Sequence, residues 1–452
     1  MGLSIYEQIE ATIATRRSCL HAYQLAEYKA VRNWLRRYRP VDESNLAQVT
    51  GYLEAFYHLS QVEDWENARS LAFMRSQVSN HQELHKQLFV WGYYRQQQRV
   101  YRTLFHQIDS AVDLACLSGL GNLEDVWGNF DRAIEYHYQA LTLARVLGSE
   151  EARVAALGSL GNAYLSLKNF ERAIDCYQQQ FDLAEMSGQP RLVGVALGGL
   201  SNAYRSIEAY ELALDAAQRR VEVARSSSDR QGEGDGYCSM GSTYLVQGEL
   251  AQALTVLSQA VTIAQSIGHR LGECRALGNL GLVYQALTKD DKAIACLEQT
   301  LVLASEIEDR EGRQMAILQL EGLQRRRQDT EQAMRYQLLA REFVSEPLDR
   351  AVLLLNLGAS CRSLGRLEAA IDHYQELLTV VELLDEAEDE QRLLRMMVLY
   401  CFALVYQEQG EIKQAWHFCQ SALDLSNEAM RPLVEKCLDL QKVLAMALQK
   451  MV

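Results

Sequence analysis

Apolar side chains recur along most of this chain at the spacing of amphipathic helices. Between Glu151 and Pro190 they fall three and four residues apart, which is the period of a helix with one buried face. This spacing predicts a first helix that ends near Leu167 and a second helix that ends near Met186. Glycine at 188 can cap the second helix, and Pro190 cannot continue it. The apolar face of each helix needs another helix to cover it, so the pattern predicts packed helical hairpins.

The same pattern returns with a step of 40 residues. Leu117-Ser-Gly-Leu-Gly-Asn122 reappears as Leu157-Gly-Ser-Leu-Gly-Asn162 and as Leu197-Gly-Gly-Leu-Ser-Asn202, and looser copies begin at Cys238 and Leu277. A fixed period of this length indicates stacked units that each contact mainly their neighbours. Such arrays present a long surface, which favours binding over catalysis as the function.

The repeated residues resemble tetratricopeptide (TPR) repeats. In that family a Leu-Gly pair on the first helix is followed by an aromatic residue and then by a small residue on the second helix, and Leu160, Gly161, Tyr164 and Ala173 match this order. The resemblance implies an all-α fold, a right-handed superhelical solenoid of about ten hairpins. The period exceeds the usual value of about 34 residues. It is similar to the long repeats of Pins-type spindle adaptors, rapsyn and related bacterial arrays.

The flanks of the array are less regular than its centre. We expect an N-terminal helical cap, two degenerate hairpins, a TPR array and a C-terminal capping helix at residues 1–44, 45–116, 117–425 and 426–452, respectively. Trp65 resembles the start of a second helix, and Trp91-Gly92 resembles the signature of a first helix. The acidic stretch Glu382–Gln391 lengthens one interval and predicts an extended helix or a solvated loop.

Composition narrows the class of protein. The chain is 48% hydrophobic, 23% charged and has four prolines, as expected for a helical globular protein. A net charge of −14 disfavours general nucleic-acid binding. The ten cysteines include no Cys-x-x-Cys pair, which favours buried thiols in a reducing compartment. Without a signal-peptide core or a long apolar run, we expect a cytoplasmic protein, with peripheral membrane contact as an open alternative.

Three asparagines mark the candidate groove. The resemblance places the first helices on the concave face of the array, with Asn122, Asn162 and Asn202 directly after the family's glycine position. It implies that these amides hold the backbone of an extended partner segment, because an amide both donates and accepts hydrogen bonds. The alternative is that each asparagine bonds a neighbouring helix backbone.

Small residues lie one turn earlier on the same helix faces: Ser118, Gly158, Gly198 and Gly278. Glycine inside a helix costs about 1 kcal/mol relative to alanine, so its recurrence indicates that something must approach closely there. The approaching group is either a ligand or a neighbouring helix.

Arginines provide charge near this surface. Arg205, Arg275 and Arg362 are placed to bind carboxylates, which favours an acidic or C-terminal peptide as partner. The paired lysines of the family's chaperone-tail clamp are absent from the matching positions. Arg325-Arg-Arg327 could also bind carboxylates, and a solvated charged edge is an equally good interpretation of these three residues.

A basic cluster lies near the N-terminus. Residues 1–40 carry seven basic and three acidic side chains, and four of the basic ones are Arg32, Arg36, Arg37 and Arg39. The cluster is suited to an anionic lipid surface, RNA or an acidic partner. The alternative is an ordinary amphipathic helix end with Trp34 and Leu35 turned inward.

No catalytic or metal-binding motif is recognisable. His81 and His85 lack the His-Glu-x-x-His order and a third ligand, and Gly232–Gly236 lacks the strand and Gly-Lys-Ser/Thr end of a phosphate loop. We therefore expect a non-catalytic scaffold or assembly factor without cofactor or metal, which binds a protein or peptide. Two alternatives are a ligand- or peptide-switched regulator, as in bacterial peptide-pheromone receptors, and an assembly factor for membrane complexes such as photosynthetic ones.

Overall fold

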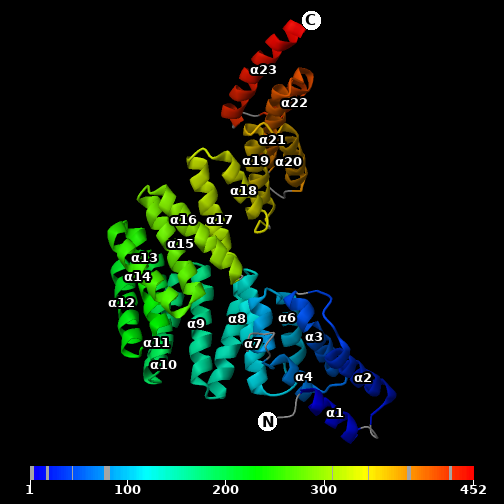
Figure 1. The fold of residues 1–452 in the computed structure, drawn as a ribbon, viewed down its shortest axis with the longest axis vertical. Coiled ribbons are helices and arrows are strands. Elements are labelled where there is room, and N and C mark those ends of the chain that lie inside the picture. The colour runs from blue at the N-terminus through cyan, green and yellow to red at the C-terminus, as the bar shows by residue number, and fades with distance from the viewer. Residues whose placement is uncertain are drawn as a thin grey trace. The chain divides into compact units, whose positions relative to one another are not determined.

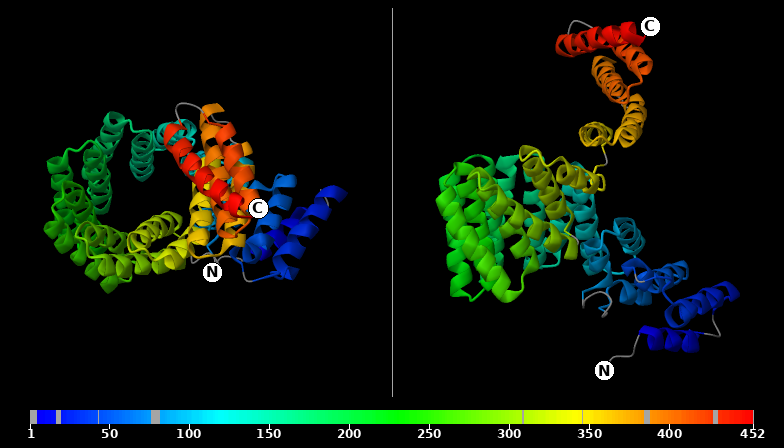
Figure 2. Two further views of the ribbon diagram at one scale, coloured as in Figure 1. Left: turned by 90° about the horizontal axis from the view of Figure 1, so that it is seen from above. Right: turned by 45° about the horizontal axis from the view of Figure 1, so that its top comes forward.

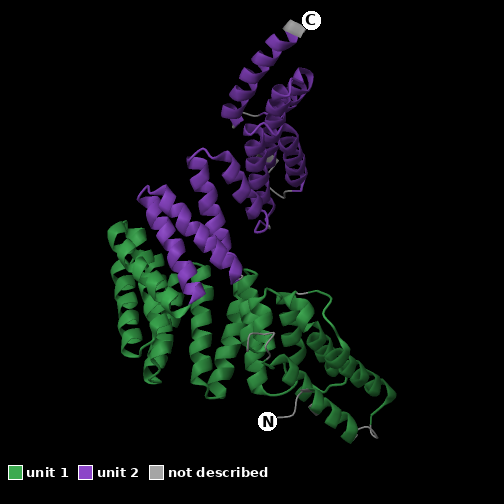
Figure 3. Ribbon diagram, in the orientation of Figure 1, with its two compact units in different colours: residues 1–268 green, residues 269–452 purple. Residues whose placement is uncertain are grey.

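The structure is a computed structural model in which all regular elements are helices. It describes residues 5–16, 20–42, 44–75, 82–307, 309–344, 346–383, 388–426 and 430–451. These residues form 23 α-helices and no sheet (Figure 1), which confirms the all-α class. The chain divides into two compact units, residues 1–268 (unit 1) and 269–452 (unit 2), which are described separately (Figure 3).

Unit 1 contains fourteen helices. They are α1 (Ile5–Arg16), α2 (Ala22–Arg37), α3 (Asn45–Gln61), α4 (Trp65–Ala72), α5 (Leu84–Val90), α6 (Tyr94–Leu104), α7 (Ser110–Val126), α8 (Phe130–Val146), α9 (Glu150–Ser166), α10 (Phe170–Met186), α11 (Pro190–Ser206), α12 (Tyr210–Ser226), α13 (Arg230–Gln247) and α14 (Leu250–Ile267).

Unit 2 contains nine helices in its described residues. They are α15 (Arg270–Ala286), α16 (Asp290–Glu306), α17 (Arg310–Arg326), α18 (Thr330–Ala340), α19 (Pro347–Ser363), α20 (Leu367–Glu382), α21 (Glu388–Glu408), α22 (Ile412–Asp424) and α23 (Arg431–Met451). The acidic stretch predicted from Glu382 to Gln391 lies partly outside the described residues. Where the structure resumes at Glu388, the chain is already helical.

Each 40-residue repeat consists of two halves of equal length, and each half is one helix and one turn. Each helix from α7 to α12 has 17 residues and is followed by a turn of three. The predicted helix ends near Leu167 and Met186 are confirmed, since α9 ends at Ser166 and α10 at Met186. Relative to a shorter repeat, the extra residues lengthen helices rather than loops, so each hairpin buries a longer seam.

Most turns of the array contain one residue with left-handed backbone geometry. Glycine meets this need at 128, 148, 188, 248 and 268, where a side chain would be strained. Other turns place an ordinary residue there, and Thr288, with φ of 56°, is β-branched. The third residue of several turns caps the next helix through a side-chain oxygen: Ser149, Asn169, Asp229, Asp309 and Asp329.

Replacing Thr288 with glycine should therefore stabilise unit 2. We expect Thr288→Gly to raise the free energy of unfolding by about 0.5–1 kcal/mol, because the left-handed strain of an L-residue exceeds the extra chain entropy of glycine. Chemical denaturation followed by circular dichroism measures the change. The reverse substitution at a glycine turn, Gly248→Ala, should destabilise by a similar amount. Unchanged stability in both variants would contradict this account of the turns.

Paired small and large residues pack each hairpin. The predicted small residues of the second helices, Ala133, Ala173, Ala213 and Ala253, are fully buried. Each Leu-Gly glycine leaves room for the residue sixteen positions later: a Cβ on Gly161 would lie 2.5 Å from the Tyr177 ring. His137, Leu257, Leu297 and Tyr374 fill the same slot in other hairpins. The hairpins thus interlock through one recurring contact.

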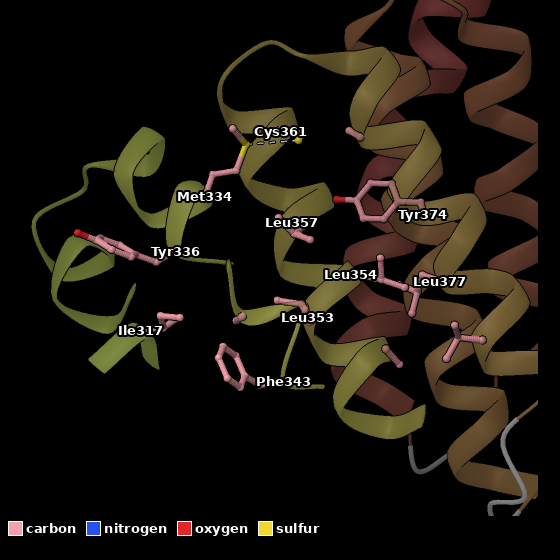
Figure 4. Packing of buried hydrophobic residues seen from close by; sticks show 14 of the residues in the cluster. Ile317, Met334, Tyr336, Phe343, Leu353, Leu354, Leu357, Cys361, Tyr374 and Leu377 are labelled. Atoms are coloured by element: carbon pink, nitrogen blue, oxygen red, sulfur yellow. Dashed lines mark hydrogen bonds between the residues drawn. The ribbon is translucent and has the colours of Figure 1, made fainter. Parts of the chain in front are cut away.

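In unit 2 the same packing continues around a shortened second helix. Helix α18 has 11 residues, among them the buried Tyr336, and Phe343 is buried just after its end. Leu354, Leu357, Tyr374 and Leu377 gather between α19 and α20 (Figure 4). The described cysteines are free thiols, and burial raises the pKa of Cys437 to about 12, as expected of structural rather than reactive cysteines.

The N-terminal helices form one core with the start of the array. Ile9, Tyr28 and Val49 belong to the same buried cluster as Leu120. The predicted second-helix start at Trp65 is confirmed by α4. The interpretation of Trp91-Gly92 as a first-helix signature is wrong, because Gly92 has φ of 75° and lies in the turn after α5.

One described helix, α14, has the length and apolar composition of a membrane span. It buries Ala253, Leu257, Ala260, Ile263 and Ala264, at the same repeat positions as the buried side chains of α16, and three of these positions are also buried in α12. Its apolar residues therefore follow the pattern of a second helix of the array.

Candidate functional site

The first helices line the concave side of unit 1. Helix α7 contacts α9, α9 contacts α11 and α11 contacts α13, whereas no comparable contact joins α8 to α10 or α10 to α12 in the described residues. A stack whose first helices lie closer together than its second helices curves toward the first helices. Figure 2 (left) shows the curve of α7–α14.

Exposed and half-buried residues, most of them small, recur along the first helices α7, α9, α11 and α13. We call these residues the inner stripe: Ser118, Asn122, Ala155, Gly158, Asn162, Val195, Gly199, Asn202, Cys238 and Ser242. All three predicted asparagines are exposed, on α7, α9 and α11. The fourth helix, α13, places Ser242 at the same repeat position. The stripe therefore presents polar groups at a regular interval from hairpin to hairpin.

The carbonyl oxygens of two asparagines are held by the chain itself. The Tyr177 hydroxyl donates to Asn162 Oδ1 at 2.6 Å, and burial raises the pKa of Tyr177, so this hydroxyl keeps its proton. Arg205 Nη2 donates to Asn202 Oδ1 at 3.3 Å. Both partners are side chains, not the helix backbone of the alternative interpretation. Each of these oxygens already accepts one bond within the chain, whereas the Nδ2 donors of the exposed Asn162 and Asn202 side chains remain available to a partner.

The recurring glycines make room for side chains of the second helices. A Cβ on Gly158 would lie 2.6 Å from Gln180 Nε2, and one on Gly198 would lie 2.7 Å from Arg220 Nη1. Gly278, in unit 2, lies against Met315. Gly198 and Gly278 are buried, while Gly158 and Ser118 are half-buried. The close approach inferred from these small residues is thus made by the chain's own side chains.

The sequence patterns did not identify Arg220 and Asp235 as residues of the candidate site. Arg220, on the second helix α12, passes Gly198 and pairs with Asp235 of α13 at 2.8 Å. Together with Arg191 and Val195 they line a small hollow of about 80 Å³ between α11 and α13. The offset of 22 positions from Gly158 to Gln180 and from Gly198 to Arg220 repeats in the sequence and is the signal that could have located Arg220, whereas Asp235 has no comparable signal.

The predicted carboxylate-binding arginines differ in their surroundings. Arg205 is half-buried beside Asn202, and burial lowers its pKa from the usual value. Arg275 is exposed on α15 of unit 2. Arg362 of α19 is paired with Glu408. Arg325, Arg326 and Arg327 pair with Glu321, Asp290 and Asp291, the pattern of a solvated charged edge.

The N-terminal arginines surround a surface hollow on α2. Arg32, Arg36, Arg37 and Arg39 line it with Asn33. Arg32 lies 3.9 Å from Glu10, and Arg36 lies over the Tyr6 ring at 5.7 Å. Trp34 and Leu35 pack against the N-terminal core, as the amphipathic-helix alternative predicts.

The described residues contain no group of three or more His, Cys, Asp or Glu side chains placed to hold a metal. His81 lies outside the described residues. His85 is buried, with Nδ1 2.8 Å from the Tyr101 hydroxyl and Nε2 3.2 Å from Glu83, so its role is in core packing.

Comparisons with known proteins agree with the repeat geometry. Residues 113–186, 152–226 and 235–306 match a tetratricopeptide repeat model, and residues 353–388 match a second one. No curated protein matches the sequence.

Several solved structures are similar to parts of this chain. A Rap protein complexed with competence and sporulation factor is 16% identical, with 74% of this chain and 98% of that chain covered and a TM-score of 0.47. A STAND-family protein with a tetratricopeptide repeat sensor from Pyrococcus horikoshii is 18% identical, with 80% and 54% covered and a TM-score of 0.45. NprR in complex with its peptide NprX is 15% identical, with 76% and 100% covered and a TM-score of 0.45.

Proposed function

Because this chain is a tetratricopeptide repeat protein, we propose that unit 1 binds an extended segment of a partner protein along the inner stripe. Binding without catalysis is its biochemical role, as a scaffold or assembly factor. No cofactor or metal takes part.

The orientation of the asparagine amides carries this proposal. With their oxygens held by Tyr177 and Arg205, Asn162 and Asn202 offer N–H donors at equivalent positions on neighbouring helices. Donors of this kind match the main-chain carbonyls of an extended segment, which every sequence presents. Asn122 continues the row on α7. The inner stripe would then recognise the backbone of the partner segment rather than its sequence. Arg205 and Arg191 favour acidic side chains in the part of the partner that lies next to them.

Changing the asparagines to aspartates tests the donors directly. Aspartate keeps the oxygens that Tyr177 and Arg205 need and removes the outward N–H groups. Short unstructured peptides selected for binding to the wild-type chain should bind the triple variant Asn122→Asp, Asn162→Asp, Asn202→Asp roughly tenfold more weakly or worse, since each lost bond contributes about 1 kcal/mol. Fluorescence anisotropy with labelled peptides measures the dissociation constants.

A matched variant controls for the added negative charge. Gln139, Gln252 and Gln259 are exposed amides on the second helices α8 and α14. Their triple replacement by glutamate should leave peptide affinity nearly unchanged, because these side chains lie outside the inner stripe. Equal affinities of the wild type and the aspartate variant would remove the asparagines from the binding site. An equal loss in both variants would show that net charge alone governs affinity.

A further inference from the structure

A cavity separates α3 from α6 at the N-terminal end of unit 1. The two helices run side by side, joined at one end by a hydrogen bond from the Leu46 N–H to the Tyr93 hydroxyl at 3.2 Å. Helices α4 and α5, which lie between them in sequence, have eight and seven residues, against 17 in α3. Neither of these short helices contributes a residue to the lining of the cavity, which comes from α3 and α6 and encloses about 210 Å³.

The cavity has an apolar floor and a polar rim. Leu46, Leu53, Phe56 and Val100 supply the apolar part of its lining. The polar part comes from Thr50, Ser60, Gln96 and Thr103. For comparison, an engineered cavity of about 150 Å³ holds a benzene molecule. The space therefore admits an aromatic ring or a branched aliphatic group together with a polar end.

Two opposite charges face this cavity without neutralising each other. Glu54 of α3 is half-buried, and Arg99 of α6 is exposed; both line the cavity. The Arg99 guanidinium lies 4.9 Å from the centre of the Tyr57 ring, which fixes it at the cavity mouth. Glu54 and Tyr57 are one helical turn apart, on the same face of α3. Within the described part of the chain, neither Glu54 nor Arg99 forms an ion pair.

We propose that this cavity binds a free α-amino acid with an apolar side chain. The α-carboxylate pairs with Arg99, the α-ammonium group pairs with Glu54, and the side chain contacts Leu53, Phe56 and Val100. A zwitterion satisfies both charges at once, whereas an anion or a cation alone would face one like charge. This site is independent of the inner stripe, since it shares none of its residues.

Titration calorimetry with the full chain tests the proposal. L-phenylalanine and L-leucine are the probes, and 3-phenylpropionate and 2-phenylethylamine are analogues that lack the ammonium group and the carboxylate, respectively. We expect at least one of the two amino acids to bind, and each analogue to bind roughly tenfold more weakly than L-phenylalanine or worse, as for loss of one charge-assisted bond. Binding of L-leucine alone also supports the site and then restricts it to aliphatic side chains.

Substitutions assign the binding to these residues. Arg99→Gln and Glu54→Gln should each weaken amino-acid binding roughly tenfold or more, and far-UV circular dichroism checks that both variants fold. Arg102→Gln is the matched control, because Arg102 is exposed on the same helix but does not line the cavity. The proposal is overturned if neither amino acid binds, if L-phenylalanine binds and an analogue binds equally well, or if the cavity variants bind like the control.

Discussion

Tyr177→Ala should lower the free energy of unfolding of unit 1 by about 3–5 kcal/mol, the range for removing a large buried aromatic side chain. Tyr177 is 3% exposed and lies between two first helices. A Cβ on Gly161 of α9 would lie 2.5 Å from its ring, and one on Gly199 of α11 would lie 2.4 Å from it. The substitution therefore empties a space that joins consecutive hairpins.

Chemical denaturation and hydrogen exchange together measure this effect. Because each hairpin contacts mainly its neighbours, protection should fall most in α9, α10 and α11. Tyr23→Ala is the control, since Tyr23 is 55% exposed and its loss should cost less than about 1 kcal/mol. Tyr177→Phe keeps the ring and removes the bond to Asn162, at a cost of about 1 kcal/mol. A loss for Tyr177→Ala as small as that for Tyr23→Ala would contradict the interlocking role.

Acidification should destabilise the N-terminal helices of unit 1 through His85. This side chain is 2% exposed, and burial lowers its pKa from 6.5 to about 4. The unfolded chain therefore takes up a proton between pH 6.5 and 4 that the folded chain does not. Stability from neutral His85 is fully present above the unfolded pKa and is lost as the pH falls toward the folded one. The loss at pH 4 amounts to about 3 kcal/mol.

A His85→Gln variant isolates this contribution from other titrating groups. Glutamine cannot take up a proton, so its stability should fall less steeply than that of the wild type between pH 6.5 and 4. Denaturation midpoints of the two proteins at a series of pH values give the comparison. At neutral pH the variant lacks the hydrogen bond between His85 Nδ1 and the Tyr101 hydroxyl. This loss lowers the free energy of unfolding of the variant by the same amount at every pH, so only the slopes of the two pH profiles are compared. Parallel pH profiles for the two proteins would disprove the role of His85.

Periodicity made the helices and the family recognisable before the structure. The spacing of Leu160, Gly161 and Ala173 predicted a first helix, a turn and a second helix, and the observed ends differ from the predicted ones by at most one residue. A short motif gave a wrong prediction where the same residues occur in two kinds of structure. Gly92 follows an aromatic residue, yet it serves a left-handed turn instead of helix packing.

The sequence predicted which residues form the candidate site but not how their side chains are oriented. Repeat register alone placed Asn122, Asn162 and Asn202 on exposed positions of the first helices. Which amide atom faces outward depends on Tyr177 and on Arg205, and these contacts form only when helices pack. The α3–α6 cavity had no sequence signal, because its lining comes from two helices that are separated in the chain and carry no shared motif.

The sequence by itself determined the all-α class, the 40-residue step and the position of most turns, because helix periodicity and small-residue spacing are local properties of the chain. Only the tertiary structure decided that Gln180 and Arg220 occupy the spaces beside Gly158 and Gly198. It also decided that the asparagine oxygens are taken and that Glu54 and Arg99 face one cavity. Those outcomes depend on how side chains from separate helices share space, and no single segment encodes that.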